Sequence, residues 1–276
     1  MGKKCLAIDK LLSEGWFDDE KEAQAWIMER NVLFNEQLIL SPKEKVPIDS
    51  IIRIKKEYKR KYVNKGGLKL EKCLRDFNIL PKDLVALDCG ASTGGFTDCL
   101  LQYGAKLVYA VDVGFGQLAG KLMNDKRVIN MEKTNLGDDI LTHLDPKPEL
   151  ISLDLSYLSL KKAIVLCEKI LGERGTVLCL VKPIYEVDSS EIRRNGEIND
   201  KKIIKDILLD LCKYFISLRL DIIGITHSAV TGNSGTLEYF IGVSWGDDQR
   251  TTLVTDIEEM VNKVIEKSLD LQLFKK

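Results

Sequence analysis

The stretch that decides the fold runs from Leu84 to Phe96 and reads LVALDCGASTGGF. An apolar run, a carboxylate and a glycine-rich loop that opens a helix are typical of a strand–loop–helix unit in a doubly wound α/β sheet. Glycines let a backbone approach a ligand closely, and the first turn of a helix has free N–H groups. Neither a dinucleotide fingerprint nor a P-loop fits, because Gly90 and Gly94 are four residues apart and no Gly-Lys-Ser/Thr follows.

Similar apolar runs recur along the rest of the chain, with helical patterns between most of them. The further runs lie at 107–112, 127–131, 149–154 and 176–182, and helical patterns include 160–171 and 199–214. Continuous apolar strands separated by helices predict a parallel sheet that is covered on both faces. Two later strands, near 216–227 and 238–245, are joined by a short polar loop, which favours antiparallel pairing. We therefore predict an α/β fold whose mostly parallel sheet ends in an antiparallel hairpin, followed by a helix over about 253–268.

The first 55 residues show a different pattern, typical of a small α+β domain. Apolar spacing indicates short helices around 6–12 and 23–28, and strands are expected near 31–34, 37–40 and 51–54. A loss of apolar periodicity then coincides with a run of basic residues. We expect a small domain over 1–55, a basic linker over 56–65 and a large domain over 66–276.

The overall composition excludes several classes of protein. The chain has 276 residues, 45% hydrophobic and 30% charged, and a formal net charge of -1, which is typical of a globular protein. No apolar run approaches the roughly 18 residues of a membrane span, and the start lacks the pattern of a signal peptide. Seven cysteines without a Cys-x-x-Cys pair indicate free thiols in a reducing cytoplasm and no structural zinc site. We expect a cytoplasmic protein without a membrane partner or a metal.

The charge is distributed unevenly. Residues 1–50 carry 7 basic and 10 acidic side chains, a net of -3, whereas residues 51–75 carry 10 basic and 2 acidic, a net of +8. This basic segment is either a solvated face or a stripe that contacts phosphates, and the interleaved Tyr58 and Tyr62 favour the second interpretation. The candidate RNA-binding residues are Arg53, Lys55, Lys56, Lys59, Arg60, Lys61 and Lys65.

Two carboxylates predict what the glycine-rich loop binds. Asp88 opens the loop, and Asp112 ends the next strand 24 residues later. A carboxylate at the loop suits a cationic group, and an acid at the end of the second strand can accept both hydroxyls of a ribose. A helix cap would explain either acid alone. A nucleoside with a cationic amino-acid tail fits both, and S-adenosylmethionine is the common example.

Four charged residues stand where an apolar sheet should not have them. Asp154 and Lys182 end two apolar strands, Glu238 opens the last strand, and Lys69 lies at the start of the large domain. The carboxyl ends of parallel strands converge on one crevice, where these charges can meet. They form either a buried ion-pair network or a site for proton chemistry, in which a lysine amine helps to deprotonate an attacking alcohol.

Taken together, these motifs resemble the TlyA family, long labelled haemolysins, over nearly the whole chain. The matching segments are 62–70 (YVNKGGLKL), 88–96, 111–118 (VDVGFGQL), 154–160 (DLSYLSL) and 181–183 (VKP). The resemblance implies a Rossmann-like, FtsJ-like methyltransferase sheet behind a small RNA-binding domain. It implies transfer of a methyl group from S-adenosylmethionine to a ribose 2'-hydroxyl, that of a cytidine, in ribosomal RNA or ribosomal subunits.

The resemblance also assigns the site residues. It implies that Lys69, Asp154, Lys182 and Glu238 form the catalytic set. The implied cofactor-binding residues are Asp88, Gly90, Ser92, Thr93, Gly94, Gly95, Phe96, Asp112, Val113, Glu132 and Asn135.

Several positions depart from the family pattern. Cys5 stands near an expected arginine, Glu36 replaces the glycine of a Val-Asn-Gly turn, and Thr236 follows Gly235 where the family has Gly-Asn. The usual Lys-Pro-Gln-Phe-Glu reads KPIYE over 182–186. The catalytic residue types are retained, so the departures bear on RNA affinity and target choice. Three alternatives stay open: a ribosome-binding or assembly protein, a membrane-active haemolysin, and a methyltransferase for small molecules.

Overall fold

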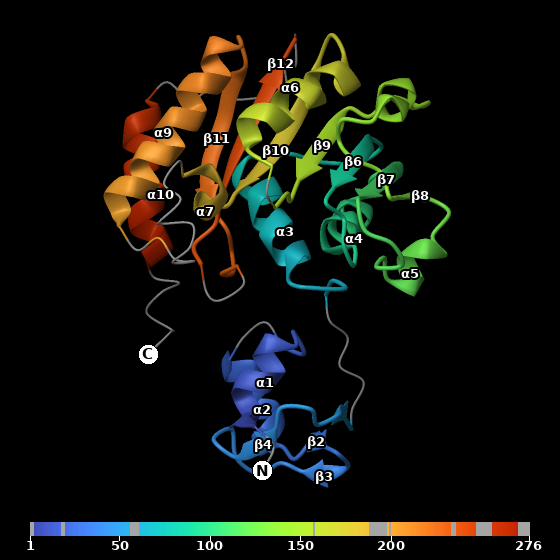
Figure 1. The fold of residues 1–276 in the computed structure, drawn as a ribbon, viewed down its shortest axis with the longest axis vertical. Helices are drawn as coiled ribbons and strands as arrows, with labels where there is room; N and C mark the ends of the chain where they lie inside the picture. Colours follow the sequence, from blue (N-terminus) through green and yellow to red (C-terminus); the bar gives the residue numbers. More distant parts are fainter. Residues whose placement is uncertain are drawn as a thin grey trace. The chain divides into compact units, whose positions relative to one another are not determined.

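The structure is a computed structural model of the chain. It describes residues 3–17, 20–55, 61–156, 158–187, 198, 200–232, 236–246 and 256–269. The chain divides into two compact units, Met1–Lys65 and Gly66–Lys276 (Figure 1).

The first unit combines two helices with two small antiparallel sheets. Its elements are β1 (Lys4–Leu6), α1 (Ala7–Ser13), α2 (Glu20–Met28), β2 (Val32–Phe34), β3 (Gln37–Leu38), β4 (Lys45–Pro47) and β5 (Ile52–Ile54). Strand β1 pairs with β4, and β2 lies between β3 and β5. Leu11, Phe17 and Ile27 lie in the core that joins helices and strands. The expected α+β character is confirmed, but the sequence did not predict β1 and β4.

The second unit is built on a seven-stranded sheet in the order β11-β12-β10-β9-β6-β7-β8. The strands are β6 (Val85–Cys89), β7 (Leu107–Asp112), β8 (Val128–Glu132), β9 (Leu150–Leu153), β10 (Gly175–Val181), β11 (Asp221–His227) and β12 (Tyr239–Trp245). The helices are α3 (Gly66–Asp76), α4 (Gly95–Gln102), α5 (Gly120–Met123), α6 (Leu160–Leu171), α7 (Pro183–Glu186), α9 (Lys201–Ser217) and α10 (Ile257–Ser268), with a 3-10 turn η1 (Asp139–His143).

The pairing of the strands confirms the predicted fold class. Strands β10, β9, β6, β7 and β8 are mutually parallel, whereas β12 runs antiparallel to both β10 and β11. The carboxyl ends of the parallel strands therefore meet at one edge of the sheet, together with the end of β11 and the start of β12. We call this edge the carboxyl edge, and every predicted catalytic residue of the sheet lies on it.

Helices cover both faces of the sheet. Alternate strand residues such as Leu87, Ile151 and Cys179 pack with α6, α9 and α10 in one large apolar core. On the other face α3 packs beside α4 (Figure 1). The end of α3 comes close to the sheet because Gly224 and Gly242 leave room for a ring: a Cβ on Gly224 would lie 2.4 Å from Phe77 Cδ1. This close packing fixes the position of α3, the helix that carries Lys69.

One predicted strand was wrong at its start. The sequence indicated a strand over 216–227, but α9 continues to Ser217 and β11 begins at Asp221. Phe215 and Leu220 are both buried in the core against β11, so their apolar character is shared by the helix end and the strand start. Short apolar segments of this kind do not separate a buried helix from a strand.

Candidate active site

The glycine-rich loop leaves the carboxyl edge between β6 and α4. Gly90 and Gly94 both have left-handed backbone angles, with φ of +87° and +96°. Ser92 and Thr93 lie at the tip of the loop, where Ser92 is exposed, whereas Gly95 and Phe96 are buried in the first turn of α4. The loop thus brings its backbone next to a helix N-terminus, as expected for a segment that holds a ligand.

Gly90 brings this loop into contact with Asp154, one of the predicted catalytic residues. A Cβ at Gly90 would lie 2.2 Å from the backbone oxygen of Asp154, so no other side chain fits there. The Asp154 N–H in turn donates to the Cys89 carbonyl at 3.0 Å. The ligand loop and the end of β9 are therefore in direct backbone contact.

Asp88 lies in β6, buried just before the loop, and supports it from inside the fold. Its side chain has 0% exposure and accepts hydrogen bonds from the Thr97 hydroxyl at 2.7 Å and the Ser152 hydroxyl at 3.3 Å. Burial raises the pKa of this carboxyl to about 7, although the Thr97 hydroxyl opposes the rise. In this structure the Asp88 side chain faces two hydroxyls inside the fold, and its contact with a cationic ligand remains a prediction.

Asp112 lies at the end of β7 and braces two loops. Its carboxylate accepts from the Ser92 N–H at 2.8 Å and from the Gly114 N–H at 2.7 Å. Each oxygen retains a second lone pair, so the carboxylate can still accept from a ribose hydroxyl. Val113 is 68% exposed beside it, which offers an apolar surface for a nucleobase.

The segment after β8 completes this side of the edge. The Glu132 carboxylate accepts from the Gly116 N–H at 2.9 Å, and the Lys133 N–H donates to the Gly114 carbonyl at 3.0 Å. Asn135 is exposed, and its side-chain oxygen accepts from the Gly137 N–H at 3.1 Å. In this structure Glu132 and Asn135 hold loops, and their contact with a cofactor remains a prediction.

The four predicted catalytic residues form two ion pairs of different character. Lys69 Nζ and Glu238 Oε2 lie 2.5 Å apart, with only 7% and 5% of the side chains exposed. Gly232 makes room for this pair, because a Cβ there would lie 2.3 Å from Glu238 Oε1. A buried pair of this kind is held in one geometry by the surrounding fold.

The second pair is more accessible. Lys182 Nζ lies 2.5 Å from Asp154 Oδ1, and the side chains are 16% and 23% exposed. Lys182 also donates to the Ser156 hydroxyl at 3.2 Å. The sequence did not single out Ser156, although it lies in the segment that begins at Asp154.

Strand register brings the two pairs to one place. Val181 pairs with Tyr239 in the antiparallel β10–β12 ladder. Lys182 directly follows β10 and Glu238 directly precedes β12, so the two residues lie at the same end of these strands. Asp154 directly follows β9, the other neighbour of β10. The structure thus places Asp154, Lys182 and Glu238 at the carboxyl edge, with Lys69 of α3 paired to Glu238, and their catalytic roles remain predictions.

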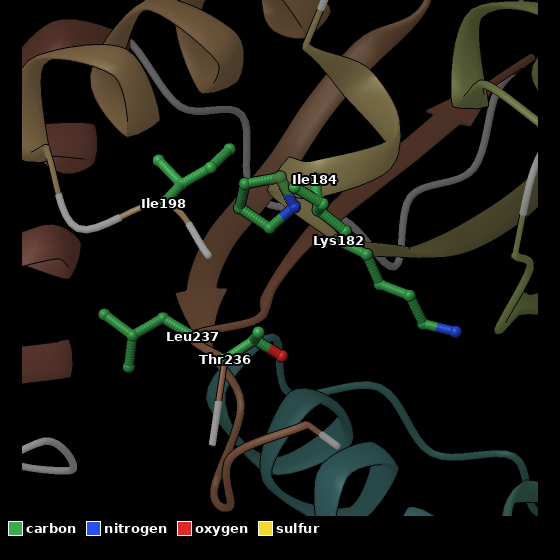
Figure 2. A pocket seen from close by; sticks show the side chains of 6 residues that line it. Lys182, Ile184, Ile198, Thr236 and Leu237 are labelled. Carbon is green, nitrogen blue, oxygen red and sulfur yellow. The ribbon is translucent and has the colours of Figure 1, made fainter. Parts of the chain in front are cut away.

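A small pocket adjoins Lys182. It is lined by Lys182, Pro183, Ile184, Ile198, Thr236 and Leu237. Figure 2 shows the ammonium of Lys182 pointing away from Ile198 and Leu237. An amine at the rim of this small hollow can bind a polar group of a ligand.

The basic segment is described only in part. Arg53 makes a bidentate contact with Glu36, with Nε at 2.8 Å from Oε1 and Nη2 at 2.5 Å from Oε2. The Lys61 ammonium lies 5.5 Å from the centre of the Tyr62 ring. Lys56, Lys59 and Arg60 lie outside the described residues, and for Lys55 and Lys65 the expected phosphate contacts remain predictions. The Arg53 guanidinium already has an acidic partner in its own unit.

Glu36 reaches Arg53 because of an unusual turn. Asn35 and Glu36 have φ of 47° and 64° between β2 and β3, the left-handed pair of a tight hairpin. Glycine is preferred at the second of these positions. The departure from Val-Asn-Gly noted above therefore puts a carboxylate at a strained position, where it neutralises a predicted RNA-binding arginine.

Three further findings concern the described residues as a whole. No group of three or more metal-binding side chains occurs among them. None of the helices they form has the length and apolar character needed to cross a membrane. The seven cysteines are free thiols, and six of them are buried.

Comparison with known proteins finds relatives that cover most of the chain. The chain is 36% identical over 273 residues to YqxC of Bacillus subtilis, provisionally named an rRNA methyltransferase, covering 97% of this chain and 95% of that protein. It is 29% identical to the 16S/23S rRNA (cytidine-2'-O)-methyltransferase TlyA of Mycobacterium tuberculosis, covering 96% and 98%. It is 35% identical to Hemolysin A of Brachyspira hyodysenteriae, covering 82% and 94%.

A solved structure and a family model lead to the same family. A protein of Streptococcus thermophilus, provisionally described as a hemolysin, superposes with a TM-score of 0.73 at 32% identity and covers all of both chains. The model of the FtsJ-like methyltransferase family matches residues 62–245. The chain therefore belongs to the FtsJ-like methyltransferase family and, as the resemblance to TlyA predicted, is similar to TlyA proteins over nearly its whole length.

Proposed function

We propose that this protein transfers a methyl group from S-adenosylmethionine to a ribose 2'-hydroxyl of ribosomal RNA. The observation that carries the proposal is the accessible pair of Lys182 and Asp154, one residue of which is in backbone contact with the ligand loop. Membership of the FtsJ-like methyltransferase family indicates that the reaction is methyl transfer. The pair supplies a place where an alcohol can be held beside that loop.

The residues at the carboxyl edge fit S-adenosylmethionine. The backbone of Ser92 and Thr93 can hold the amino-acid tail, Asp112 can accept a ribose hydroxyl, and Val113 can cover the adenine. Gly90 and Gly94 supply the close approach that only glycine allows there. Asp88 is buried beneath the loop and supports it through Thr97 and Ser152.

The chain's own residues then act mainly by positioning. Bound S-adenosylmethionine supplies a methyl group on a sulfonium, which a ribose oxygen can attack in line. Lys182 and Asp154 hold the 2'-hydroxyl against the loop, and a Lys182 amine in its neutral form would take the hydroxyl proton as the oxygen–methyl bond forms and the sulfur–methyl bond breaks. Lys69 and Glu238 are buried, so we assign them the task of fixing the start of β12 beside Lys182.

The substrate is inferred from the relatives and from charge. Proteins named rRNA (cytidine-2'-O)-methyltransferases from Mycobacterium tuberculosis and Campylobacter jejuni are 29% and 32% identical to this chain. We propose a cytidine as the target, as the names of these relatives indicate. The basic residues of 53–65 then contact the phosphates, and the protein acts in the cytoplasm, where ribosomes are found.

A single-turnover transfer assay tests this function. Purified protein is mixed with radiolabelled S-adenosylmethionine and with unmethylated 30S or 50S subunits, and label in RNA is counted over a range of salt. We expect transfer by wild type and at least a hundredfold loss in Lys182→Met, with cofactor affinity retained. Tight ribosome binding without transfer by wild type would contradict the proposal and favour an assembly protein.

A membrane-disrupting activity is the second candidate, because one relative is named Hemolysin A. It predicts that the purified protein releases a dye from lipid vesicles. We expect no release at protein concentrations that saturate methyl transfer. Release that persists in Lys182→Met would instead support a haemolysin whose action does not need the methyl-transfer site.

A further inference from the structure

The carboxylate of Glu186 joins two segments that carry the accessible ion pair. Its Oε1 accepts from the Leu160 N–H at 2.9 Å, and its Oε2 accepts from the Ser159 hydroxyl at 2.8 Å. Ser159 caps α6 and Leu160 is its first residue, and the two follow closely after the segment that carries Asp154 and Ser156. Glu186 itself ends α7, which begins directly after Lys182.

Helix α7 places Lys182 and Glu186 at a fixed separation. It is a single turn with Pro183 at its first position, and the Tyr185 N–H donates to the Lys182 carbonyl at 2.9 Å. Proline fixes its own backbone angle and is well suited to the first position of a helix. Any movement of Glu186 is therefore passed to the backbone of Lys182.

The start of α6 needs the acceptor that Glu186 provides. The Lys161 N–H is capped by the Ser159 side chain, and the next two N–H groups donate to the Ser159 carbonyl. The Leu160 N–H is bound by Glu186. In many helices a glutamate three residues after the cap accepts from the backbone of the cap residue itself, but here that position is Lys162. A carboxylate from another element is thus built into the start of α6.

The two segments are consequently joined at both ends. Lys182 contacts Asp154 and Ser156 at one end, and Glu186 contacts Ser159 and Leu160 at the other. We infer that Glu186 is a positioning residue, which holds the 154–160 segment in the one arrangement that presents Asp154 and Ser156 to Lys182. This inference rests on the proposed function for the reaction it serves, but the contacts themselves are independent of it.

The buried position of the Glu186 carboxyl fits a role in holding neighbouring groups in place. Desolvation raises the pKa of Glu186, and the Leu160 N–H and Ser159 hydroxyl oppose that rise. Lys161 and Asp210 act on the same carboxyl from α6 and α9 with opposite signs. A glutamine at this position can keep both contacts, since its oxygen can accept from Leu160 and its amide can donate to the Ser159 hydroxyl. An alanine keeps neither.

The test compares Glu186→Ala, Glu186→Gln and a matched control, Asp256→Ala. Asp256 is the N-cap residue of α10 and accepts from the Glu259 N–H at 3.0 Å, so its loss removes a carboxylate from a helix start elsewhere in the unit. We expect kcat for RNA methylation to fall about 10- to 100-fold in Glu186→Ala, the size of effect that misplacement by about 1 Å produces. Cofactor affinity and the KM for RNA stay within about twofold of wild type, and Glu186→Gln and Asp256→Ala keep a kcat near that of wild type.

A second readout does not depend on activity. Hydrogen exchange of peptides covering 154–162 should speed up in Glu186→Ala, but not in Glu186→Gln or Asp256→Ala. Unchanged exchange in Glu186→Ala, or a glutamine variant as impaired as the alanine variant, would overturn the positioning role. If wild type transfers no methyl group to RNA while the exchange pattern is as expected, the proposed function fails and the positioning role of Glu186 stands.

Discussion

The buried pair of Lys69 and Glu238 permits a quantitative test of how the site is built. Both side chains are at least 93% buried and their charged atoms lie 2.5 Å apart. Replacing Glu238 with methionine removes one charge and leaves the Lys69 ammonium in an apolar setting. Breaking a buried pair in this way costs about 3–5 kcal/mol, whereas replacing both partners by apolar residues of similar volume is often neutral. We expect each single methionine variant to lose about that much stability.

The double variant Lys69→Met/Glu238→Met should then recover to within about 1.5 kcal/mol of wild type, the usual cost of a shape-conserving swap. Urea unfolding can follow the second unit alone by the fluorescence of Trp245, which is buried, if Trp16 and Trp26 are replaced by phenylalanine in every variant. The exposed pair Lys201–Glu266, at 52% and 68% side-chain exposure, is the matched control and should show no measurable coupling. Nearly additive losses for Lys69 and Glu238 would refute the assignment of a buried, mutually stabilising pair.

Three further perturbations follow from the contacts described above. Gly90→Ala should lower methyl transfer by about a hundredfold or more, because its Cβ would meet the Asp154 carbonyl oxygen at 2.2 Å; Gly120→Ala, where nothing lies within 4 Å, is the control, and equal activity of the two variants would contradict the close contact. Asp88→Asn should flatten the dependence of stability on pH. The folded state holds the Asp88 proton up to a pKa of about 7, whereas the unfolded chain releases it near 3.8, so wild type loses stability as the pH rises between these values. Relative to Asp88→Asn, wild type should lose about 3 kcal/mol between pH 5 and pH 8 in urea unfolding, and a constant difference would show that Asp88 is not a buried acid. Glu36→Gly should free Arg53, raise RNA affinity and steepen its salt dependence, measured by filter binding at several salt concentrations, and a lower affinity would contradict the idea that Glu36 neutralises an RNA contact.

The sequence was sufficient for the central sheet and for the gathering of charges. Apolar runs that end in a charged residue are rare in a buried sheet, so the ends of these runs already mark Asp154 and Lys182 as residues at strand ends. Once the strands are parallel, their carboxyl ends have to meet, and Glu238 follows from the antiparallel hairpin. The positions of these residues depend on periodicity and topology, which a single sequence records.

The contacts made by side chains could not be predicted in the same way. Asp88 looks like a ligand-binding carboxylate in the sequence, but Thr97 and Ser152 enclose it from a helix and from another strand. The pairing of Glu186 with Ser159 joins residues 27 apart, and no local pattern indicates it. Strands β1 and β4 were missed for a related reason, since strands of three residues have too few positions to show alternation.

The charge of the first unit also depends on a side-chain contact that the sequence does not predict. A count of charged residues predicts a strongly basic stripe around 53–65, but the turn at Asn35 and Glu36 brings a carboxylate onto Arg53. Net charge along the chain therefore overstates the positive field that an RNA would meet at this point. RNA affinity should depend more on Lys55, Lys56, Lys59 and Arg60, and neutralising these four should lower both the affinity and its salt slope.

The central claim is that the hydroxyl held by Lys182 and Asp154 is a ribose 2'-hydroxyl of ribosomal RNA. The most direct test labels unmethylated ribosomal subunits with radioactive S-adenosylmethionine and digests the RNA with alkali, which cannot cleave next to a 2'-O-methylated ribose. We predict that the label remains in an alkali-resistant dinucleotide from a defined cytidine, and that Lys182→Met leaves the RNA unlabelled. Label recovered in alkali-sensitive mononucleotides, or transfer by Lys182→Met at the rate of wild type, would contradict the account.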